Sequence, residues 1–452
     1  MGLDLARIFK AYDVRGVVPS EFDADIARAT GAAFVRLLDA KEIVIAHDMR
    51  ESSGPLSAAF AEGATSQGAD VVLAGLGSTD LLYFAAGSLN LPGAMFTASH
   101  NPAKYNGIKM CRAGAAPIGQ ETGLAEIRDM VATGVPEFTG TPGSVREIDL
   151  RDAYVAHLRG LVDLSGIRPL KVAVDAGNGM GGYTVPAAFA DLPLDVVPLY
   201  FELDGSFPNH EANPIEPENL RDLQKAVRDS GADIGLAFDG DADRCFVVDE
   251  RGELVTPSTI TALVAERELA REPGGTIIHN VIVSKAVPEL VRKLGAVPVR
   301  TRVGHSFIKG EMARTGAIFG GEHSGHFYFR DFWRADSGML AALHVLAALG
   351  GQAGPLSALL DGYAPYAVSG EINSEVADAA ASMKAIEAEY AHKATDIDHL
   401  DGLTISLADG SWFNLRPSNT EPLLRLNVEA GDDDTMSRLR DEVLASIRGG
   451  RD

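Results

Sequence analysis

The chain has little cysteine: Cys111 and Cys245 are the only two among 452 residues. So few cysteines exclude the disulfide framework of small secreted domains and fit a reducing compartment. The N-terminus lacks the basic and apolar segments of a secretory signal peptide. These absences predict a cytoplasmic protein.

Basic residues and long apolar runs are also scarce. The chain has 40 Lys and Arg against 63 Asp and Glu, a formal net charge of −23. Because such a chain repels nucleic acids and anionic membranes, neither is an expected partner. The longest apolar stretch, residues 339–349, is interrupted by His344 and is too short to span a bilayer. An anionic ligand therefore needs a locally basic site.

One order of predicted elements occurs three times along the chain. A β-branched strand is followed by a helix, a second strand and a third strand that ends in a polar loop. The first strands are 42–48, 171–178 and 276–285; the helices are 55–68, 183–192 and 284–295; the second strands are 69–74, 194–200 and 296–301; the third strands are 94–96, 233–238 and 317–319. This alternation predicts α/β units, whose ligands bind in the loops beyond the strand ends.

The C-terminal part has a different pattern. It contains a strand at 369–376, a helix at 378–394, strands at 403–407, 411–415 and 423–429, and a last helix. We therefore predict three related α/β/α domains with mixed sheets and a C-terminal α+β domain, placed around a central cleft. The proposed bounds are 1–148, 149–252, 253–366 and 367–452.

The first polar loop, residues 97–102, contains a candidate nucleophile. Ser99 directly follows a strand, His100 is adjacent, and Lys109 lies a short way on. A nucleophilic serine needs exposure, nearby donors and a base or charged partner. Taken alone, Ser-His-Asn-Pro is also an ordinary turn.

The second loop carries three carboxylates at alternate positions, Asp239, Asp241 and Asp243, followed by Arg244. Carboxylates on one loop can converge on Mg²⁺, which prefers oxygen ligands and often shares them with a phosphate. The spacing resembles an EF-hand, but Arg244 stands where that loop requires glycine, and the flanks are strand-like. A solvated acidic turn is less favourable, because three aspartates repel one another without a cation.

The third loop, residues 320–326, offers Glu322, His323, Ser324 and His326. These side chains supply donors and acceptors suited to sugar hydroxyls. Two histidines and a glutamate could also bind zinc, and a glycine-rich turn with solvated side chains is the third interpretation.

The fourth loop is rich in groups that bind phosphate. Its polar residues are Arg416, Ser418, Asn419 and Thr420, with Arg425 following. Arginine forks, hydroxyls and backbone N–H groups suit a phosphate dianion, although a Pro-bounded surface turn has the same composition.

Residues 177–182 match the pattern G-x-G-x-x-G of dinucleotide-binding proteins. A single match is weak evidence. Pro186 interrupts the helix that should follow, and only Glu202 could serve as the acidic residue after the next strand. We interpret this segment as a tight turn.

Together the loops resemble those of the α-D-phosphohexomutase superfamily, and closely its phosphomannomutase/phosphoglucomutase branch. The resemblance runs from Tyr12-Asp13-Val14-Arg15-Gly16 to the Arg416 loop, nearly the whole chain. It implies a heart-shaped molecule with the active site in the central cleft, and a hexose phosphate substrate whose phosphoryl group moves between C1 and C6.

The resemblance also implies roles for individual residues. Ser99 matches the phosphorylated serine, Asp239, Asp241 and Asp243 match the Mg²⁺ ligands beside a phosphoserine oxygen, and Glu322 and Ser324 match the residues that grip the sugar's O3 and O4. Arg416, Ser418, Asn419 and Thr420 match the loop that holds the non-reacting phosphate, with Tyr12, His323 and Arg425 as further substrate contacts. The residues expected around the reacting phosphoryl group are Arg15, His100, Lys109, Arg244, His305 and His326.

One position departs from the family pattern. Relatives commonly place a basic residue where this chain has Ile282, and Lys285 follows nearby. The substitution puts one phosphate contact in doubt, not the chemistry.

The implied reaction uses a hexose 1,6-bisphosphate, which forms from phospho-Ser99 and turns end over end before it returns the other phosphoryl group. A histidine or Lys109 handles the substrate's proton, and the sequence does not choose among them. Both mannose and glucose phosphates are expected substrates, and the protein is expected to be a monomer or a homodimer. The alternatives are a phosphoglucosamine mutase, although Asn419 and His323 are unusual there, a phosphatase, and a non-catalytic sugar-phosphate-binding protein.

Overall fold

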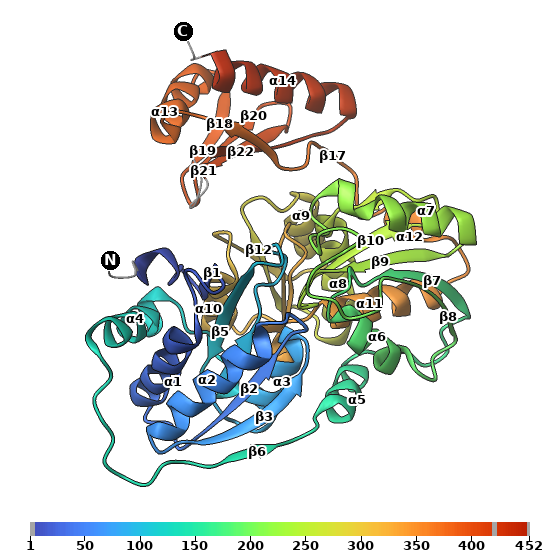
Figure 1. Cartoon of the computed structure of the whole chain (residues 1–452). Coiled ribbons are helices and arrows are strands. Elements are labelled where there is room, and N and C mark those ends of the chain that lie inside the picture. Colours follow the sequence, from blue (N-terminus) through green and yellow to red (C-terminus); the bar gives the residue numbers. More distant parts are fainter. Residues whose placement is uncertain (1–4, 418–422, 450–452) are drawn as a thin grey trace.

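The computed structural model describes residues 5–417 and 423–449. Four sheets follow one another along the chain (Figure 1). In the described part of the chain, no helix is both long and apolar enough to cross a membrane.

The first three sheets are mixed. In spatial order, the first contains β1 (Val14–Val17), β5 (Tyr105–Cys111), β4 (Gly93–Phe96), β2 (Glu42–His47), β3 (Asp70–Leu76) and β6 (Val145–Glu147). The second contains β11 (Leu254–Val255), β10 (Cys245–Asp249), β9 (Ile234–Phe238), β7 (Leu170–Asp175) and β8 (Leu194–Leu199). The third contains β13 (Val297–Thr301), β12 (Thr276–Asn280), β14 (Phe319–Gly321), β15 (Phe327–Phe329) and β16 (Ala335–Asp336).

All three sheets share a four-strand unit. The central strand of each (β2, β7 or β12) pairs in parallel with a strand on either side. The second of these neighbours (β4, β9 or β14) then pairs antiparallel with the strand that follows it. The predicted repeat is therefore present, and each polar loop connects the two strands of this last pair.

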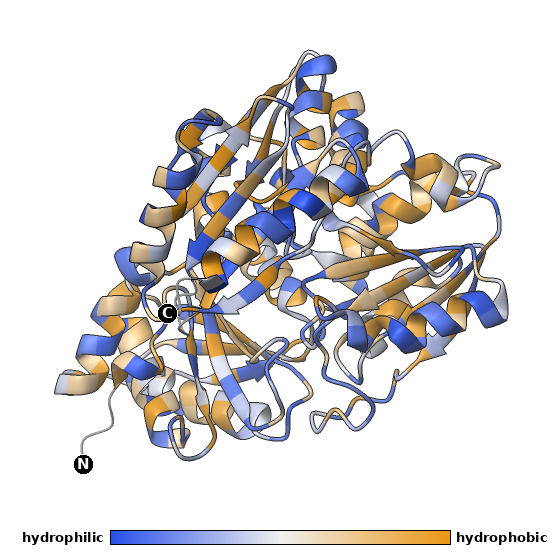
Figure 2. Cartoon of the chain, turned by 90° about the horizontal axis from the view of Figure 1, so that it is seen from above, coloured by the Kyte–Doolittle hydropathy of each residue, from blue (hydrophilic) through white to orange (hydrophobic). Residues whose placement is uncertain are grey.

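The helices around these sheets are α1 (Ala24–Leu38), α2 (Ser53–Ser66), α3 (Thr79–Ser88), α4 (Leu124–Thr133), α5 (Arg151–Leu161), α6 (Gly181–Phe189), α7 (Arg221–Ser230), α8 (Pro257–Arg271), α9 (Ala286–Lys293), α10 (His305–Thr315), α11 (Gly338–Gly350) and α12 (Leu356–Leu360). Short 3₁₀ helices cover Leu5–Arg7, Ala113–Ala115, Gln120–Thr122, Pro217–Leu220 and Arg330–Phe332. In Figure 2 hydrophobic residues concentrate along the strands, and the outer helices carry hydrophilic faces.

The fourth sheet is antiparallel throughout. Its order is β17 (Ala367–Val368), β22 (Leu423–Ala430), β21 (Trp412–Pro417), β20 (Leu403–Leu407) and β19 (Ala394–Asp398), and β18 (Ile372–Glu375) also pairs with β22. With α13 (Ala379–Tyr390) and α14 (Asp433–Gly449) it forms the α+β domain that the sequence predicts.

Two local expectations were wrong. The strand expected at 276–285 ends at Asn280, whose side-chain carbonyl accepts a hydrogen bond from the backbone N–H of Ile282 (3.1 Å) and so turns the chain. Pro186 does not interrupt a helix either, because α6 runs through it. A proline removes one backbone donor, and the buried packing of α6 outweighs that loss.

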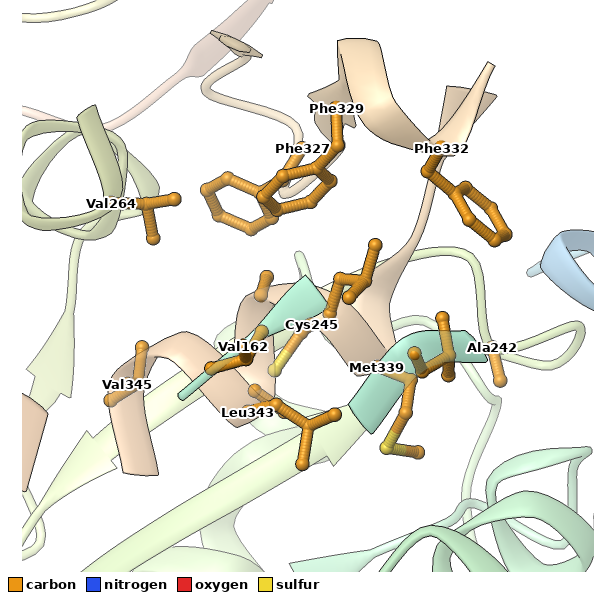
Figure 3. Packing of buried hydrophobic residues seen from close by; sticks show 14 of the residues in the cluster. Val162, Ala242, Cys245, Val264, Phe327, Phe329, Phe332, Met339, Leu343 and Val345 are labelled. Carbon is orange, nitrogen blue, oxygen red and sulfur yellow. The ribbon is translucent and has the colours of Figure 1, made fainter. Parts of the chain in front are cut away.

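One large hydrophobic cluster joins the first three domains. It includes Val44 in β2, Val172 in β7 and Ile277 in β12. Figure 3 shows part of it, where Cys245 and Ala242 of the second domain face Met339 and the phenylalanines Phe327 and Phe332 of the third. The fourth domain has a separate core around Phe413, Leu426 and Val443.

Candidate active site

The first polar loop holds Ser99 in an unusual conformation. Its φ is +48°, in the left-handed region that non-glycine residues rarely adopt, and its side chain is almost fully buried. Strain of this kind clusters at functional sites. The buried Arg50 stabilises the turn, because its guanidinium donates to the backbone carbonyls of Ser99 (2.8 Å) and Asn101 (2.7 Å).

The second loop lies directly against the first. The Ser99 hydroxyl donates to Asp239 Oδ2 (2.6 Å), although 140 residues separate the two in sequence. A side chain at Gly240 would meet the Ser99 carbonyl at 2.3 Å, so the two loops approach more closely there than any side chain permits. A Cβ at Gly179 would meet the Gly240 carbonyl at 2.7 Å, so the 177–182 turn packs behind the second loop.

The three aspartates of the second loop fit a metal ion. Ligand atoms of Asp239, Asp241 and Asp243 lie within 4.8 Å of one another, and all three residues are buried. Buried polar atoms normally have hydrogen-bond partners, yet Oδ1 of Asp241 and Oδ1 of Asp243 accept no hydrogen bond from the residues that the structure describes. Two unsatisfied carboxylate oxygens beside a third carboxylate suit Mg²⁺.

The charges around these aspartates differ sharply. Burial raises the pKa of Asp239 to about 7, and the neighbouring aspartates add to this while Arg244 opposes it. Burial also disfavours ionisation of Asp241, but the ammonium of Lys109 outweighs that effect and holds its pKa below the usual range. Lys109 Nζ contacts Asp241 Oδ2 (2.7 Å) and Asp243 Oδ2 (2.5 Å). The loop therefore concentrates negative charge that one lysine and one arginine balance.

Two of the expected basic residues, Arg244 and His100, contact the Ser99 hydroxyl. Arg244 donates from Nη2 to Ser99 Oγ (3.1 Å) and from Nε to Asp239 Oδ2 (3.0 Å), and it also hydrogen-bonds His100 Nδ1. Burial, with the charges of Arg244 and Arg15, lowers the pKa of His100 well below its ordinary value, so its ring is neutral. Arg15 pairs with Asp13 and with the side chain of Asn101.

The third loop adjoins the second. A bridge pairs the backbones of Arg244 and His326, and His326 Nδ1 lies 2.9 Å from Asp336 Oδ2. Burial lowers the pKa of His326, but Asp243 and Asp336 outweigh it, and the net shift is upward. The other oxygen of Asp336 is 2.8 Å from the buried Lys309 ammonium.

Glu322 is buried and held at both oxygens. Tyr328 donates to Oε2 (2.7 Å), and Asn280 (3.2 Å) and the backbone N–H of Gly304 (2.9 Å) donate to Oε1. Among the described residues, Glu322, His323 and His326 do not form a metal-binding group, so the zinc alternative has no geometric support. Ser324 is partly exposed on the same loop, and His323 lines a small cavity between the third and fourth domains.

An aromatic contact joins the first and third domains beside these loops. The rings of Tyr12 and His305 lie 4.8 Å apart, edge to face. Burial and nearby charges lower the pKa of His305 to about 3, so this ring is neutral too.

Of the fourth loop and the residue that follows it, the structure describes the two arginines, Arg416 and Arg425. Glu371 lies between them, 3.5 Å from Arg416 and 3.3 Å from Arg425. The Nε atoms of both arginines are buried and have no hydrogen-bond partner among the described residues. Ser418, Asn419 and Thr420 lie outside the described residues.

Lys285 does not supply the basic group that relatives commonly have at the position of Ile282. Its ammonium hydrogen-bonds the Gly410 carbonyl of the fourth domain and lies 4.0 Å from the centroid of the Tyr366 ring. Ile282 is buried beside it. Lys285 therefore fastens the third domain to the fourth.

Sequence reasoning missed several polar residues of the site, namely Arg50, Thr79, Lys309, Asp336 and Glu371. Arg50 and Thr79 act on predicted residues from distant parts of the chain, Asp336 contacts His326 within the third domain, Lys309 pairs with Asp336, and Glu371 contacts both predicted arginines. Three of them, Arg50, Lys309 and Asp336, are recognised once the structure shows that they are buried, because charged groups are rarely buried without a partner.

Comparison with known proteins places the whole chain in one family. The models of phosphoglucomutase/phosphomannomutase alpha/beta/alpha domains I, II and III match residues 6–136, 152–252 and 256–366, and that of the C-terminal domain matches 371–446. A phosphomannomutase of Salmonella typhimurium is 41% identical over 97% of this chain and 98% of its own length. A protein of Xanthomonas campestris described as phosphohexose mutases is 41% identical over 98% and 99%.

Solved structures agree. A phosphoglucomutase/phosphomannomutase family protein of Burkholderia thailandensis superposes with a TM-score of 0.89 at 35% identity, over 98% of both chains. Because models of one family match all four domains in order, the chain belongs to the phosphoglucomutase/phosphomannomutase family.

Proposed function

We propose that this enzyme carries a phosphoryl group on Ser99 and exchanges it with a hexose monophosphate through a hexose 1,6-bisphosphate. As a family member at about 40% identity to phosphomannomutases, the chain is a phosphohexomutase, an enzyme of the isomerase class. The observation that carries the proposal is the position of the Ser99 hydroxyl, 2.6 Å from Asp239 and 3.1 Å from Arg244.

The second loop, which we call the metal loop, holds a metal ion beside the phosphoryl group on Ser99. Asp239, Asp241 and Asp243, with an oxygen of the phosphoserine, hold Mg²⁺, which when bound neutralises phosphate charge. Arg244 donates to the Ser99 hydroxyl, Arg15 donates to the side chain of Asn101 in the same loop, and both offset negative charge that develops during transfer.

His326 is the candidate best placed to move the substrate's proton. Lys109 is engaged by two aspartates, and His100 accepts from Arg244. The Nδ1 of His326 is held by Asp336, which fixes the ring and leaves Nε2 for the substrate. An imidazole oriented in this way suits general acid–base transfer of the substrate's hydroxyl proton.

The sugar and the distal phosphate bind on the remaining loops. Glu322 and Ser324 take the O3 and O4 hydroxyls, with His323, Tyr12 and His305 beside them. Arg416 and Arg425 grip the non-reacting phosphate through donors that are now unpaired, and Ser418, Asn419 and Thr420 complete that site. A grip at O3 and O4 tolerates both epimers at C2, so mannose and glucose phosphates both react.

The test is a coupled mutase assay with Mg²⁺ and catalytic hexose 1,6-bisphosphate on mannose 1-phosphate and glucose 1-phosphate. We expect turnover of both, with a ratio of kcat/KM below about 10⁴, because a larger ratio requires a site that reads the C2 hydroxyl directly. Ser99→Ala should abolish turnover, and Ser66→Ala, whose hydroxyl bonds only the carbonyl of Gly63 outside the site, should not. Full activity of Ser99→Ala would refute the phosphoserine, and no turnover of either sugar would point to a glucosamine phosphate.

A further inference from the structure

The N-terminus of α3, in the first domain, touches the metal loop of the second. Thr79 is the first residue of this helix and is fully buried. Its backbone N–H donates to the Asp241 carbonyl (3.0 Å), and its hydroxyl donates to Asp241 Oδ2 (2.5 Å), across 162 residues of sequence. One threonine therefore holds both the backbone and the side chain of a metal-loop aspartate.

The two oxygens of Asp241 have different surroundings. Oδ2 accepts from the Thr79 hydroxyl and from the Lys109 ammonium (2.7 Å). Oδ1 is buried and accepts no hydrogen bond within the described part of the chain. Because Oδ2 is already bonded twice, Oδ1 is the atom left for a cation, and the Thr79 hydrogen bond fixes the carboxylate rotation that presents it.

Other contacts hold Thr79 in place. Ser78 caps α3, and the neighbouring Asp80 accepts from the hydroxyl of Ser337 in the third domain (2.6 Å). One turn along the helix, the ring of Tyr83 lies 3.9 Å from the ammonium of Lys309. The start of α3 is thus fixed between the second and third domains, so the Thr79 hydroxyl has little freedom to follow a moving carboxylate.

We propose that Thr79 is a positioning residue of the metal site, which holds Asp241 Oδ2 so that Oδ1 faces the ion. The inference rests on the proposed metal function and assigns a role to a residue outside the acidic loop. We assign Thr79 as a positioning residue rather than a ligand, because its hydroxyl engages Oδ2, the carboxylate oxygen that the ion does not take. Removal of a hydrogen bond to a metal ligand typically weakens metal affinity 10–100-fold.

Mn²⁺ binding to the whole dephosphorylated protein tests the proposal, measured by calorimetry and by the electron paramagnetic resonance of free Mn²⁺. Thr79→Val keeps the shape of the side chain and removes the hydroxyl, and we expect it to weaken binding by about 10–100-fold. Thr79→Ser keeps the hydroxyl and should bind within about threefold of wild type. The matched control is Thr30→Val, another fully buried threonine of the first domain, whose hydroxyl bonds only the Ile26 carbonyl (2.7 Å).

Activity supplies a second readout that a purely structural role does not produce. The Mg²⁺ concentration for half-maximal activity should rise in Thr79→Val while kcat at saturating Mg²⁺ recovers to within about threefold of wild type. If Thr79→Val does not fold, Thr79→Ala paired with Thr79→Ser answers the same question. Equal Mn²⁺ affinity of wild type and Thr79→Val would overturn the role of Thr79 alone, whereas wild-type protein that binds no Mn²⁺ would overturn the metal assignment with it.

Discussion

The first three domains and the fourth domain are built differently. One hydrophobic cluster extends through the first three domains, and the first domain also holds a second cluster around Phe34, Phe60 and Phe96. The fourth domain has its own core and meets the third through polar contacts. These contacts include Lys285 to Gly410, Val303 to Asp401 and Arg302 to Leu400, and Figure 1 shows the fourth domain standing apart from the first.

The residues of the candidate active site are also divided between the first three domains and the fourth. Ser99, the aspartates and His326 lie in the first three domains, which we call the joined body. There they are mostly buried, and hydrogen bonds connect them across domains. Arg416 and Arg425 lie in the separate domain, partly exposed and only loosely paired with Glu371. Phosphoryl transfer depends on fixed alignment, and gripping a distal phosphate depends mainly on charge, so the two tasks tolerate different degrees of rigidity. Changes in the joined body should alter kcat and stability, and changes in the fourth domain should alter KM.

The largest effect is expected for Arg244→Ala. This substitution removes the buried partner of Asp239 and a donor to Ser99, so kcat should fall by roughly 10²–10³ and stability by about 3–5 kcal/mol. Coupled assays and thermal unfolding measure the two losses. Arg244→Lys retains the charge and should keep part of the stability, and an unchanged kcat in either variant would contradict the role of Arg244.

Asp80→Asn tests the joined body through its pH dependence. Burial raises the pKa of Asp80 to about 6, with Asp243 adding to the shift and hydrogen bonds from Ser337, Ser78 and Tyr154 opposing it. Because the folded protein holds this proton more tightly than the unfolded chain, stability falls as pH rises from about 4 through 6, by about 3 kcal/mol in total. The stability of Asp80→Asn does not fall in this way, because its side chain has no proton to lose.

Calorimetry of the metal-free protein measures the Asp80→Asn effect. The melting temperature of the variant minus that of wild type should increase between pH 4.5 and 7. Asp163→Asn, at an exposed carboxylate bonded only to Ser165, is the control and should show no such increase. A difference that stays constant with pH would argue against a buried, protonated Asp80.

Arg416→Lys should separate binding from chemistry in the fourth domain. Lysine keeps the charge but loses the planar fork that matches phosphate, so KM should rise about tenfold while kcat changes little. The unfolding temperature should stay close to that of wild type, because the side chain belongs to no buried ion pair of the joined body. A fall in kcat with unchanged KM would place this arginine in the chemistry instead.

The smallest effect is expected for Glu371→Gln. The carboxylate competes with a phosphate dianion for Arg416 and Arg425, and its neutralisation should lower KM by about threefold, in keeping with the strength of a partly exposed ion pair. Steady-state kinetics at low ionic strength measure this change best, because salt screens it. An increase in KM would show that Glu371 orients the arginines rather than competing for them.

Local sequence features predicted much of the fold. The family, the four-domain architecture and the mutase activity are confirmed, and the element order of the first three domains matches the observed shared unit. The domain bounds and the roles of individual site residues stay predictions. Errors occurred where a local signal was ambiguous, as at Pro186, whose helix is stabilised by buried packing, and after Asn280, where a side chain ends the strand.

The sequence by itself determined where the polar loops follow the strands, because strand periodicity and the residues that follow each strand are local properties. Only the tertiary structure decided what each loop meets: Ser99 against Asp239, Thr79 against Asp241, Asp336 against His326 and Glu371 between two arginines. The first two pairs come from packing of the first domain against the second, and the last two form within the third and the fourth domain. Burial then set their charges, since a carboxylate that is ordinary in water acquires a shifted pKa and a fixed orientation once it is enclosed.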